Sequence, residues 1–315
     1  MEAVSRLLAH SRAELSKAVV GQQELVDQCL VTILASGHAL IEGVPGIAKT
    51  LVVKVFALLL RTNFQRVQCT SDLMPADLLG SNILNMANST FNLHRGPIFT
   101  DLLLVDEINR MPPRTQAALL EAMEERQVTI DGTRYPLDDL FTVFATQNPI
   151  EFEGTYPLPE AQLDRFLLKI RATYPDAERE IEILEKHHNG FEPRNLEELR
   201  IQPVEIAVLA QARQELKKIR VEPALFQYLT NIVRRSRDWP SLSLGASPRA
   251  ALSLMAAAKA YAAMEARDFL IPDDVKQAAL PVLRHRVILK PEAELEGIDA
   301  DRVIGDLLAA VEVPK

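Results

Sequence analysis

The stretch Gly43-Val44-Pro45-Gly46-Ile47-Ala48-Lys49-Thr50 decides the fold, because it has the composition of a loop that binds phosphate. Residues 38–42 before it predict a short buried strand, and Leu51 opens an apolar run to residue 60 that predicts a helix. Glycines let backbone N–H groups turn toward phosphate oxygens, and the helix N-terminus adds the positive end of its dipole. The sequence therefore predicts a nucleoside triphosphate site built on residues 43–51.

Three side chains of this loop decide how well it matches the pattern. Lys49 is expected to reach the terminal phosphates, and the Thr50 hydroxyl to hold Mg²⁺. The usual glycine before the lysine is Ala48 here, which the loop can accept if this residue has helical backbone angles. A Gly/Pro loop before an apolar helix is also ordinary turn chemistry, so the motif needs support from the rest of the chain.

Length and composition predict a globular protein of two domains. The chain has 315 residues, of which 48% are hydrophobic and 25% charged, so it can fold without disulfides or metals. Its net charge of −8 argues against broad binding to a nucleic-acid backbone, although a local basic channel in an assembly is compatible with it. We therefore expect no nucleic-acid partner.

The cysteines and the apolar segments bear on the compartment. Cys29 and Cys69 lie beside apolar residues and fit no metal spacing, which predicts small core residues. The N-terminus has no charged region followed by a long apolar run, and no segment approaches the roughly eighteen apolar residues of a membrane span. We expect a cytoplasmic protein with no membrane span.

The turn Val19-Val20-Gly21-Gln22 separates two predicted helices, 2–18 and 22–36. In a nucleotide-binding domain this turn could lay Val19 and Val20 against the adenine base, with backbone groups such as those of Gly21 contacting its edge. An ordinary helix–helix corner explains the local pattern equally well.

Residues 69–100 separate the predicted strand 64–68 from the next strand candidate. This segment is too long for a plain crossover and contains two weak strand-like pieces, near 82–84 and 90–93. We expect an insertion that leaves the core as a small hairpin or a broken helix. Long excursions of this kind are more often functional than neutral.

The apolar run 102–106 ends in Asp106-Glu107, as a buried strand does when acidic side chains lie at its C-terminal edge. Asp106 could hold Mg²⁺ through water, and Glu107 could polarise the water that attacks the terminal phosphate. Alone, the acidic pair is ordinary loop chemistry. We expect its strand one place over from the phosphate-loop strand, where the catalytic interpretation is favoured.

Two further features follow the acids. Residues 127–130 and 133–135 predict a hairpin around Asp131-Gly132, either a solvated ribbon or a probe that contacts a substrate or a neighbouring subunit. A buried strand at 141–146 ends before Asn148, whose amide could hold the attacking water opposite Glu107. A turn-forming Asn-Pro pair is the alternative explanation for Asn148.

Two arginines complete the candidate site. Arg165 lies where a short helix meets the last strand; it could pair with Asp164 or Glu160, or act as a finger on the phosphate of an adjacent subunit. Beyond about residue 176 the pattern is helical. Arg249 lies in the first turn of a helix that opens at Pro248, where a cation opposes the dipole and favours an anion such as the ATP phosphate of its own chain. Residues 284–286 predict a charged helix end, and His187-His188 a solvated one.

Six motifs in this order resemble the MoxR family of AAA+ ATPases over about residues 1–290: Val20-Gly21-Gln22, 43–50, 104–110, 145–149, 158–165 and Ser247-Pro248-Arg249. Ala48 is a trait of this family. The resemblance implies the following roles: Walker A for Lys49 and Thr50, Walker B for Asp106 and Glu107, sensor 1 for Asn148, the arginine finger for Arg165, sensor 2 for Arg249, the helix-2 insert for 69–100 and the presensor hairpin for 127–140.

The resemblance also implies ATP or ADP with Mg²⁺ as ligands, a hexameric ring, remodelling of protein clients, and a partner with a von Willebrand factor A domain. We expect a P-loop αβα core with a parallel sheet at about 1–190 and a smaller all-helical lid at about 191–315. Within one chain, Lys49, Arg249 and the acids are expected around the nucleotide, with Arg165 supplied by another copy. A chelatase-type or DNA-translocating motor and a non-enzymatic nucleotide-dependent scaffold are the alternatives.

Overall fold

The computed structural model describes residues 1–86, 89–149, 154–193 and 195–314. Its centre is a five-stranded parallel sheet in the order β2-β5-β8-β1-β9. The strands are β1 (Ala39–Glu42), β2 (Phe64–Gln68), β5 (Leu102–Asp106), β8 (Thr142–Gln147) and β9 (Leu168–Arg171). Because all five are parallel, the segments that follow their carboxyl ends share one edge of the sheet.

The lateral order of the strands differs from the prediction at one place. The strand of the acids, β5, is not adjacent to the phosphate-loop strand β1, because β8 pairs with both of them. Strand β8 is buried along almost its whole length and takes the central position, whereas the partly exposed β2 lies at the edge. The polar residues that follow β8 therefore lie between the phosphate loop and the acids.

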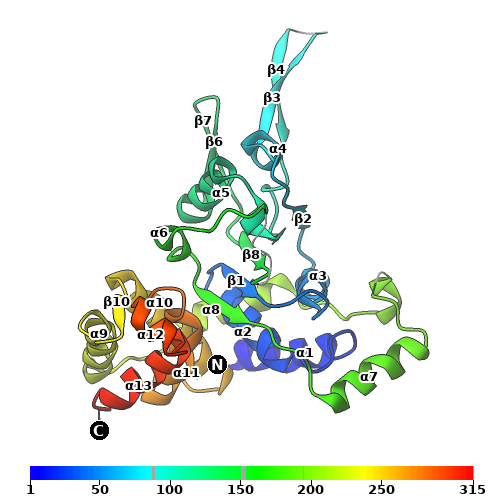
Figure 1. The fold of residues 1–315 in the computed structure, drawn as a ribbon. Coiled ribbons are helices and arrows are strands. Elements are labelled where there is room, and N and C mark those ends of the chain that lie inside the picture. The colour runs from blue at the N-terminus through cyan, green and yellow to red at the C-terminus, as the bar shows by residue number, and fades with distance from the viewer. Residues whose placement is uncertain (87–88, 150–153, 194, 315) are drawn as a thin grey trace.

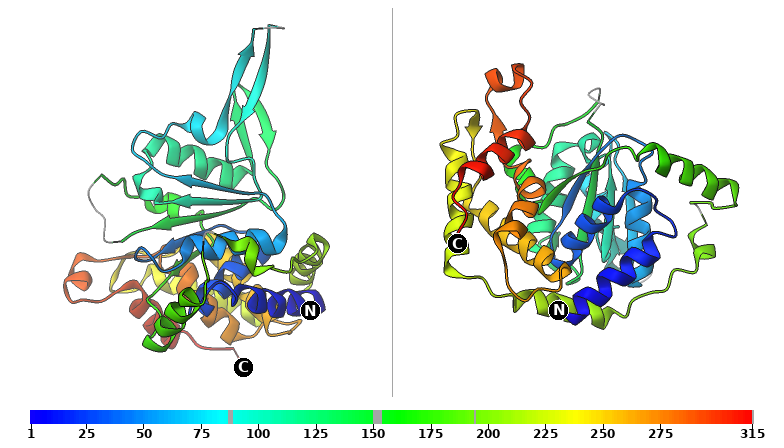
Figure 2. Two further views of the ribbon diagram at one scale, coloured as in Figure 1. Left: turned by 90° about the vertical axis from the view of Figure 1, so that its right-hand side faces the viewer. Right: turned by 90° about the horizontal axis from the view of Figure 1, so that it is seen from below.

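Helices cover both faces of this sheet, as Figure 2 shows in its left view. On one face, Leu40, Leu103 and Val143 pack in a hydrophobic cluster with α5 (Pro113–Glu125). On the other face, Ile41, Leu104 and Phe144 pack in a larger cluster. Three helices next to the sheet contribute to this larger cluster: α1 (Glu2–Leu15), α2 (Gln23–Leu34) and α3 (Lys49–Leu60). The alternation of strand side chains thus produces the predicted three-layer αβα core.

Two ribbons project together from this core (Figure 1). The predicted insert forms both a short helix and a hairpin, which are α4 (Pro75–Leu79), β3 (Gly80–Asn85) and β4 (Thr90–Arg95). The second ribbon consists of β6 (Gln127–Ile130) and β7 (Thr133–Pro136), as predicted. Residues 87–88 of the predicted insert lie outside the described residues. Asn82 Nδ2 donates to Asp131 Oδ2 at 2.8 Å and joins the two ribbons.

The root of the insert requires a glycine. Gly80 has φ +93°, and a Cβ there would lie 2.1 Å from the carbonyl oxygen of His94. The two strands can therefore approach each other only because this position has no side chain.

The rest of the chain is mainly helical and packs beneath the core, mostly against the first two helices (Figure 1). Its main helices are α7 (Ala177–His188), α8 (Ile206–Lys217), α9 (Pro223–Arg237), α10 (Pro248–Met264), α11 (Pro272–Leu283), α12 (Pro291–Leu295) and α13 (Ala300–Ala310). The helical lid is thereby confirmed, and it adds one small antiparallel ribbon of β10 (Leu242–Leu244) and β11 (Ile288–Leu289). Three short helices are α6 (Glu160–Leu163) and the 3₁₀ turns η1 (Ile108–Arg110) and η2 (Leu196–Leu199).

Within the described parts of the chain, no helix is both long enough and apolar enough to cross a membrane.

Candidate functional site

A cavity of about 490 Å³ opens at the carboxyl edge of β1, β5 and β8. It brings together ten of the residues proposed from the sequence, namely Val20, Pro45, Gly46, Ala48, Lys49, Thr50, Leu51, Asp106, Glu107 and Asn148. The loop residues Gly43, Val44 and Ile47 lie behind this lining, where Ile47 is buried and Val44 packs against the main hydrophobic cluster. The phosphate loop, the acids and the amide therefore share one site.

The backbone of the phosphate loop is more strained than the sequence suggests. Ala48 lies in the left-handed region at φ +66° and ψ +16°, so the right-handed helical angles that would make its methyl group easy to accept are not present. For an alanine this conformation costs roughly 1–2 kcal/mol. Gly46 also has a positive φ, +88°. Together they turn the loop into the N-terminus of α3, and Lys49 Nζ donates to the carbonyl oxygen of Gly43.

The two acids are held by one threonine that the sequence analysis missed. Thr146 Oγ1 donates to Asp106 Oδ1 at 3.1 Å and accepts from the Glu107 N–H at 3.0 Å. Glu107 itself is left-handed, with φ +58°. The signal that could have revealed Thr146 is its position: it is a polar residue near the C-terminal end of a strand whose middle, 143–145, is apolar, and such ends share one edge of the sheet with the acids.

Three further polar side chains surround the acids. Arg66 Nε pairs with Asp106 Oδ2 at 2.6 Å, and Arg66 Nη2 donates to Gln68 Oε1 at 2.9 Å. Gln68 Nε2 donates to Glu107 Oε2 at 3.3 Å, and Arg110 Nε pairs with the same oxygen at 3.0 Å. The sequence analysis gave none of them a role, although Arg66 and Gln68 are two residues apart on β2 and so lie on one face.

The apolar end of the cavity is formed by the turn at residues 19–22 and by a segment far from it in the sequence, around residues 183–191. Val20 lines it together with Ile183 of α7 and Phe191. Gly21 does not line this cavity; it lines a neighbouring one of about 340 Å³. Of the two valines proposed to contact the base, Val20 lines the phosphate cavity, whereas Val19 lines the neighbouring one with Gly21. The structure adds residues from α7 that the sequence analysis had given no role here.

The two arginines lie on a different part of the molecule. Arg165 Nη1 donates to the carbonyl oxygen of Leu120 in α5 at 2.6 Å, in a polar cavity of about 580 Å³ that Arg134 also lines. Arg249 pairs with Glu124, also in α5. Neither arginine is among the described residues that line the phosphate cavity. The expectation that Arg249 faces the nucleotide of its own chain is therefore not met, because α10 begins beside α5.

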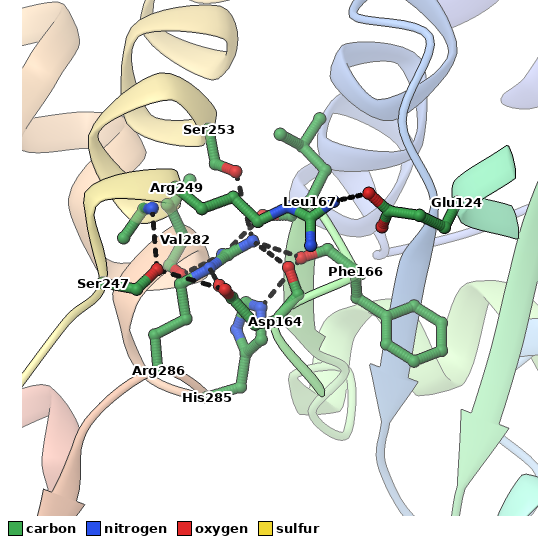
Figure 3. A network of polar contacts seen from close by, with 11 residues as sticks. Glu124, Asp164, Phe166, Leu167, Ser247, Arg249, Ser253, Val282, His285 and Arg286 are labelled. Atoms are coloured by element: carbon green, nitrogen blue, oxygen red, sulfur yellow. Dashed lines mark hydrogen bonds and ion pairs between the residues drawn. The ribbon is translucent and has the colours of Figure 1, made fainter. Parts of the chain in front are cut away.

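Arg286 is the centre of a buried network close to Arg249 (Figure 3). Residues 284–286 follow the end of α11, as expected, but the last two are buried, since His285 and Arg286 are 5% and 7% exposed. Arg286 Nε pairs with Asp164 Oδ1 at 2.6 Å, so Asp164 is not a partner of Arg165. Burial lowers the pKa of Arg286 from its ordinary value, and its hydrogen bond to Asp164 opposes this shift. The remaining partners of its guanidinium are the carbonyl oxygens of Asp164, Phe166, Leu167 and Val282 and the hydroxyl of Ser253.

The cysteines are small core residues, as predicted. Both are free and buried. Burial raises the pKa of the Cys69 thiol to about 12, with a further contribution from the nearby Asp106 and Glu107, and burial also raises that of Cys29. Among the described residues, no group of histidine, cysteine and acidic side chains could hold a metal on its own.

Comparison with known proteins agrees with this geometry. Residues 38–168 match the family model described as "ATPase family associated with various cellular activities (AAA)", and residues 234–307 match that of the AAA lid domain. The chain is 41% identical to "Chaperone MoxR1" of Mycobacterium tuberculosis, over 96% of this chain and 81% of that protein. It belongs to the MoxR family of AAA+ ATPases.

Two more relatives of this MoxR-family chain span nearly its whole length. "Protein MoxR" of Methylorubrum extorquens is 32% identical over 96% of this chain and 93% of that protein. The crystal structure of a protein assigned as an ATPase from Cytophaga hutchinsonii is 40% identical and superposes with a TM-score of 0.90, covering 100% of this chain and 98% of that one. The αβα core and its lid are thus those of an AAA+ protein.

Proposed function

We propose that this MoxR-family protein hydrolyses Mg-ATP at sites shared between neighbouring copies in a ring, and uses the energy to remodel or activate protein clients. One observation carries the proposal: the phosphate loop and the acids line one cavity, whereas Arg165 and Arg249 both contact α5 outside it. A single chain therefore offers two incomplete halves of a catalytic site.

The residues present fit a nucleotide with its metal. The cavity of about 490 Å³ is large enough for a nucleotide and combines an apolar end at Val20 with the loop and Lys49 at the other. Thr50 and Asp106 supply oxygen ligands of the kind that Mg²⁺ prefers. When bound, Mg²⁺ neutralises charge on the phosphates. Lys49, which donates to Gly43 in this structure, would move its amine to the terminal phosphates.

Glu107 and Asn148 would divide the handling of the attacking water. Glu107 would orient the water and accept its proton, and Asn148 would hold it from the other side. Both line the same cavity, and β8, which precedes Asn148, lies between the phosphate-loop strand and the strand of the acids. Thr146 supports both acids through its hydroxyl group.

The two arginines would act on the nucleotide of a neighbouring copy. Among the described residues, the arginine that lines the phosphate cavity of its own chain is Arg66, which is paired with Asp106. An arginine finger from another copy would contribute about 10³- to 10⁵-fold to the rate, as in related phosphoryl transfers. Arg165 and Arg249 contact α5 one turn apart, at Leu120 and Glu124, so both could reach the nucleotide of the same neighbouring copy. The hexameric ring, the division of domains at about residue 190 and a cytoplasmic location are parts of this proposal that rest on the family resemblance.

A protein client fits this chain better than DNA. The projecting β3-β4 hairpin exposes the apolar side chains Ile83 and Phe91, which suit contact with another protein. The turn of the second ribbon carries Asp131, which is occupied by Asn82 and would repel a phosphate backbone. One relative is named a chaperone. A partner with a von Willebrand factor A domain is proposed from the family alone.

Assembly and turnover measured together test the proposal. Phosphate release per subunit should rise with protein concentration over the range in which sedimentation shows the subunits assembling, and added duplex DNA should leave it unchanged. Turnover per subunit that is constant from far below to far above this range would contradict the shared site. An assembled protein that binds ATP and releases no phosphate would favour the scaffold, and stimulation by DNA would favour the DNA motor.

A further inference from the structure

The ion pair of Asp164 with Arg286 lies close to the N-terminus of α10, which carries Arg249 (Figure 3). Arg165 follows Asp164 directly in the chain. Arg249 lies in the first turn of α10, whose N-cap residue Ser247 donates to Asp164 Oδ2 at 3.1 Å. One carboxylate thus connects the segment of Arg165 in the core to the helix of Arg249 in the lid.

Arg286 holds the backbone on both sides of Arg165. Its Nη2 donates to the carbonyl oxygens of Asp164 and Phe166 at 3.1 and 2.6 Å. Its Nη1 donates to the carbonyl oxygen of Leu167 at 3.1 Å. Because the peptide groups before and after Arg165 are both tied to one rigid guanidinium, the backbone of Arg165 has little freedom to move.

The same guanidinium also reaches the helix of Arg249. Arg286 Nη2 donates to the Ser253 hydroxyl at 3.2 Å, one turn beyond Arg249 on α10. Ser247 and Ser253 therefore attach α10 to the Asp164–Arg286 pair before and after Arg249. Arg249 and Arg165 are then held at a fixed separation, as their shared contact with α5 also indicates.

Stability alone does not explain a charge at this position. The side chain of Arg286 is 2% exposed, and removing a guanidinium from water costs about as much as its ion pair and hydrogen bonds return. Well-packed apolar residues often stabilise such sites equally well. What the planar guanidinium supplies in addition is a fixed geometry among several acceptors at once.

We propose that Arg286 is a positioning residue for catalysis between copies: with Asp164 it holds Arg165 and Arg249 in one frame, so that both reach the phosphates of a neighbouring copy together. The inference rests on the proposed shared site. Arg286 itself does not contact the nucleotide, and the phosphate loop and acids of its own chain do not depend on it.

The chain offers a matched control two residues away. Arg284 is also buried, with a side chain 7% exposed, but its Nε pairs with Asp301 at 3.0 Å and its Nη1 donates to the carbonyl oxygen of Lys169 at 3.2 Å. Arg286→Lys should lower kcat by about ten- to a hundredfold with nucleotide affinity and KM nearly unchanged, because it displaces a reacting group. Arg284→Lys should keep turnover within about twofold. Asp164→Asn should resemble Arg286→Lys.

Mixed assemblies decide whether the defect lies in the arginines. Arg286→Lys subunits keep a working phosphate loop, so mixing them with Lys49→Ala subunits, which supply intact arginines, should restore turnover. Mixing them with Arg165→Ala subunits should not. A reference mixture of Lys49→Ala with Arg165→Ala tests the shared site itself.

The outcomes separate the two proposals. If the reference mixture is active and the Arg286→Lys mixture with Lys49→Ala is not, the positioning role is wrong and the shared site stands. The positioning role is also wrong if Arg284→Lys lowers kcat as much as Arg286→Lys. If the reference mixture is inactive, the shared site fails and the positioning role fails with it.

Discussion

The phosphate side and the arginine side of this molecule hold their charged groups in opposite ways. Around the phosphate loop, Arg66 and Arg110 have side chains 46% and 42% exposed, and they pair with Asp106 and Glu107, respectively. On the arginine side, Arg286 is enclosed and tied to several fixed acceptors. In the proposed mechanism, the exposed ion pairs around the phosphate loop can rearrange when the nucleotide binds. The two arginines that would act on a neighbouring copy are held instead by a buried, rigid network.

The largest effect should come from the arginine side. Arg165→Ala should lower turnover by about 10³- to 10⁵-fold, because it removes the charge that stabilises the transition state. Binding of a fluorescent ATP analogue to the isolated subunit should be unchanged, since Arg165 is outside the phosphate cavity. Arg134→Ala in the same polar cavity serves as the control and should have a much smaller effect. Loss of nucleotide affinity in the isolated Arg165→Ala subunit would contradict the proposal, because it would mean that Arg165 contacts the nucleotide of its own chain.

The acid on the phosphate side should come next. Glu107→Gln should bind ATP with near-normal affinity and hydrolyse it about 10²- to 10⁴-fold more slowly, because the amide cannot accept a proton from water. Single-turnover phosphate release measures this step directly. Glu178→Gln on the exposed face of α7 should leave the rate unchanged. Normal turnover by Glu107→Gln would remove Glu107 from the catalytic role.

A pH series tests the stability of the elements that hold the arginines. Burial lowers the pKa of His38 to about 3, and its ring accepts from the Val143 N–H and contacts the carbonyl oxygen of Met123 in α5. Burial likewise lowers the pKa of His285, which contacts Phe166. Both histidines are thus buried next to the elements that hold the arginines.

The sign follows from these lowered pKa values. Each histidine is neutral in the folded state and binds a proton on unfolding, so its contribution to stability is complete above about pH 6.5 and is lost as the pH falls below that value, for His38 down to about pH 3. The free energy of unfolding in urea should therefore fall by up to about 1.4 kcal/mol per pH unit for each histidine below pH 6.5. His38→Gln should flatten this slope and His187→Gln, exposed at the end of α7, should not. An equal slope in all three proteins would contradict the assignment.

The smallest expected effect concerns the backbone of the phosphate loop. Ala48→Gly should raise the free energy of unfolding by up to about 1 kcal/mol, because glycine adopts the left-handed conformation without the alanine penalty. Gly46→Ala should lower it by a similar amount: φ is +88° there, and no atom lies within 4 Å of the added Cβ, so only backbone strain changes. Thermal unfolding of the two variants measures both. Changes of the same sign would exclude backbone strain as the cause.

Sequence periodicity predicted the phosphate side better than the arginine side, for a physical reason. The loop, the acids and Asn148 each follow a strand, and parallel strands bring the segments at their ends together whatever the order of the strands. The order itself was missed at β8, because a buried strand pattern shows that a strand has neighbours and not which ones. Lateral position is thus a tertiary property.

The arginine side depends on contacts between segments far apart in the chain. The burial of His285 and Arg286 could not be predicted from the local sequence, because most of their acceptors, at 164–167, lie about 120 residues away in the chain. Arg249 was assigned to its own nucleotide because its helix start favours an anion, and Glu124 supplies that anion instead. Local electrostatics predicted the kind of partner correctly and could not identify the residue.

One measurement tests the shared site most directly. Lys49→Ala subunits have intact arginines with a defective phosphate loop, and Arg165→Ala subunits have the reverse. Each should be nearly inactive alone. When equal amounts are mixed and allowed to assemble, about one interface in four pairs an intact loop with an intact Arg165, so turnover should rise to about a quarter of the wild-type value. A mixture no more active than its two components would contradict a site completed by another copy.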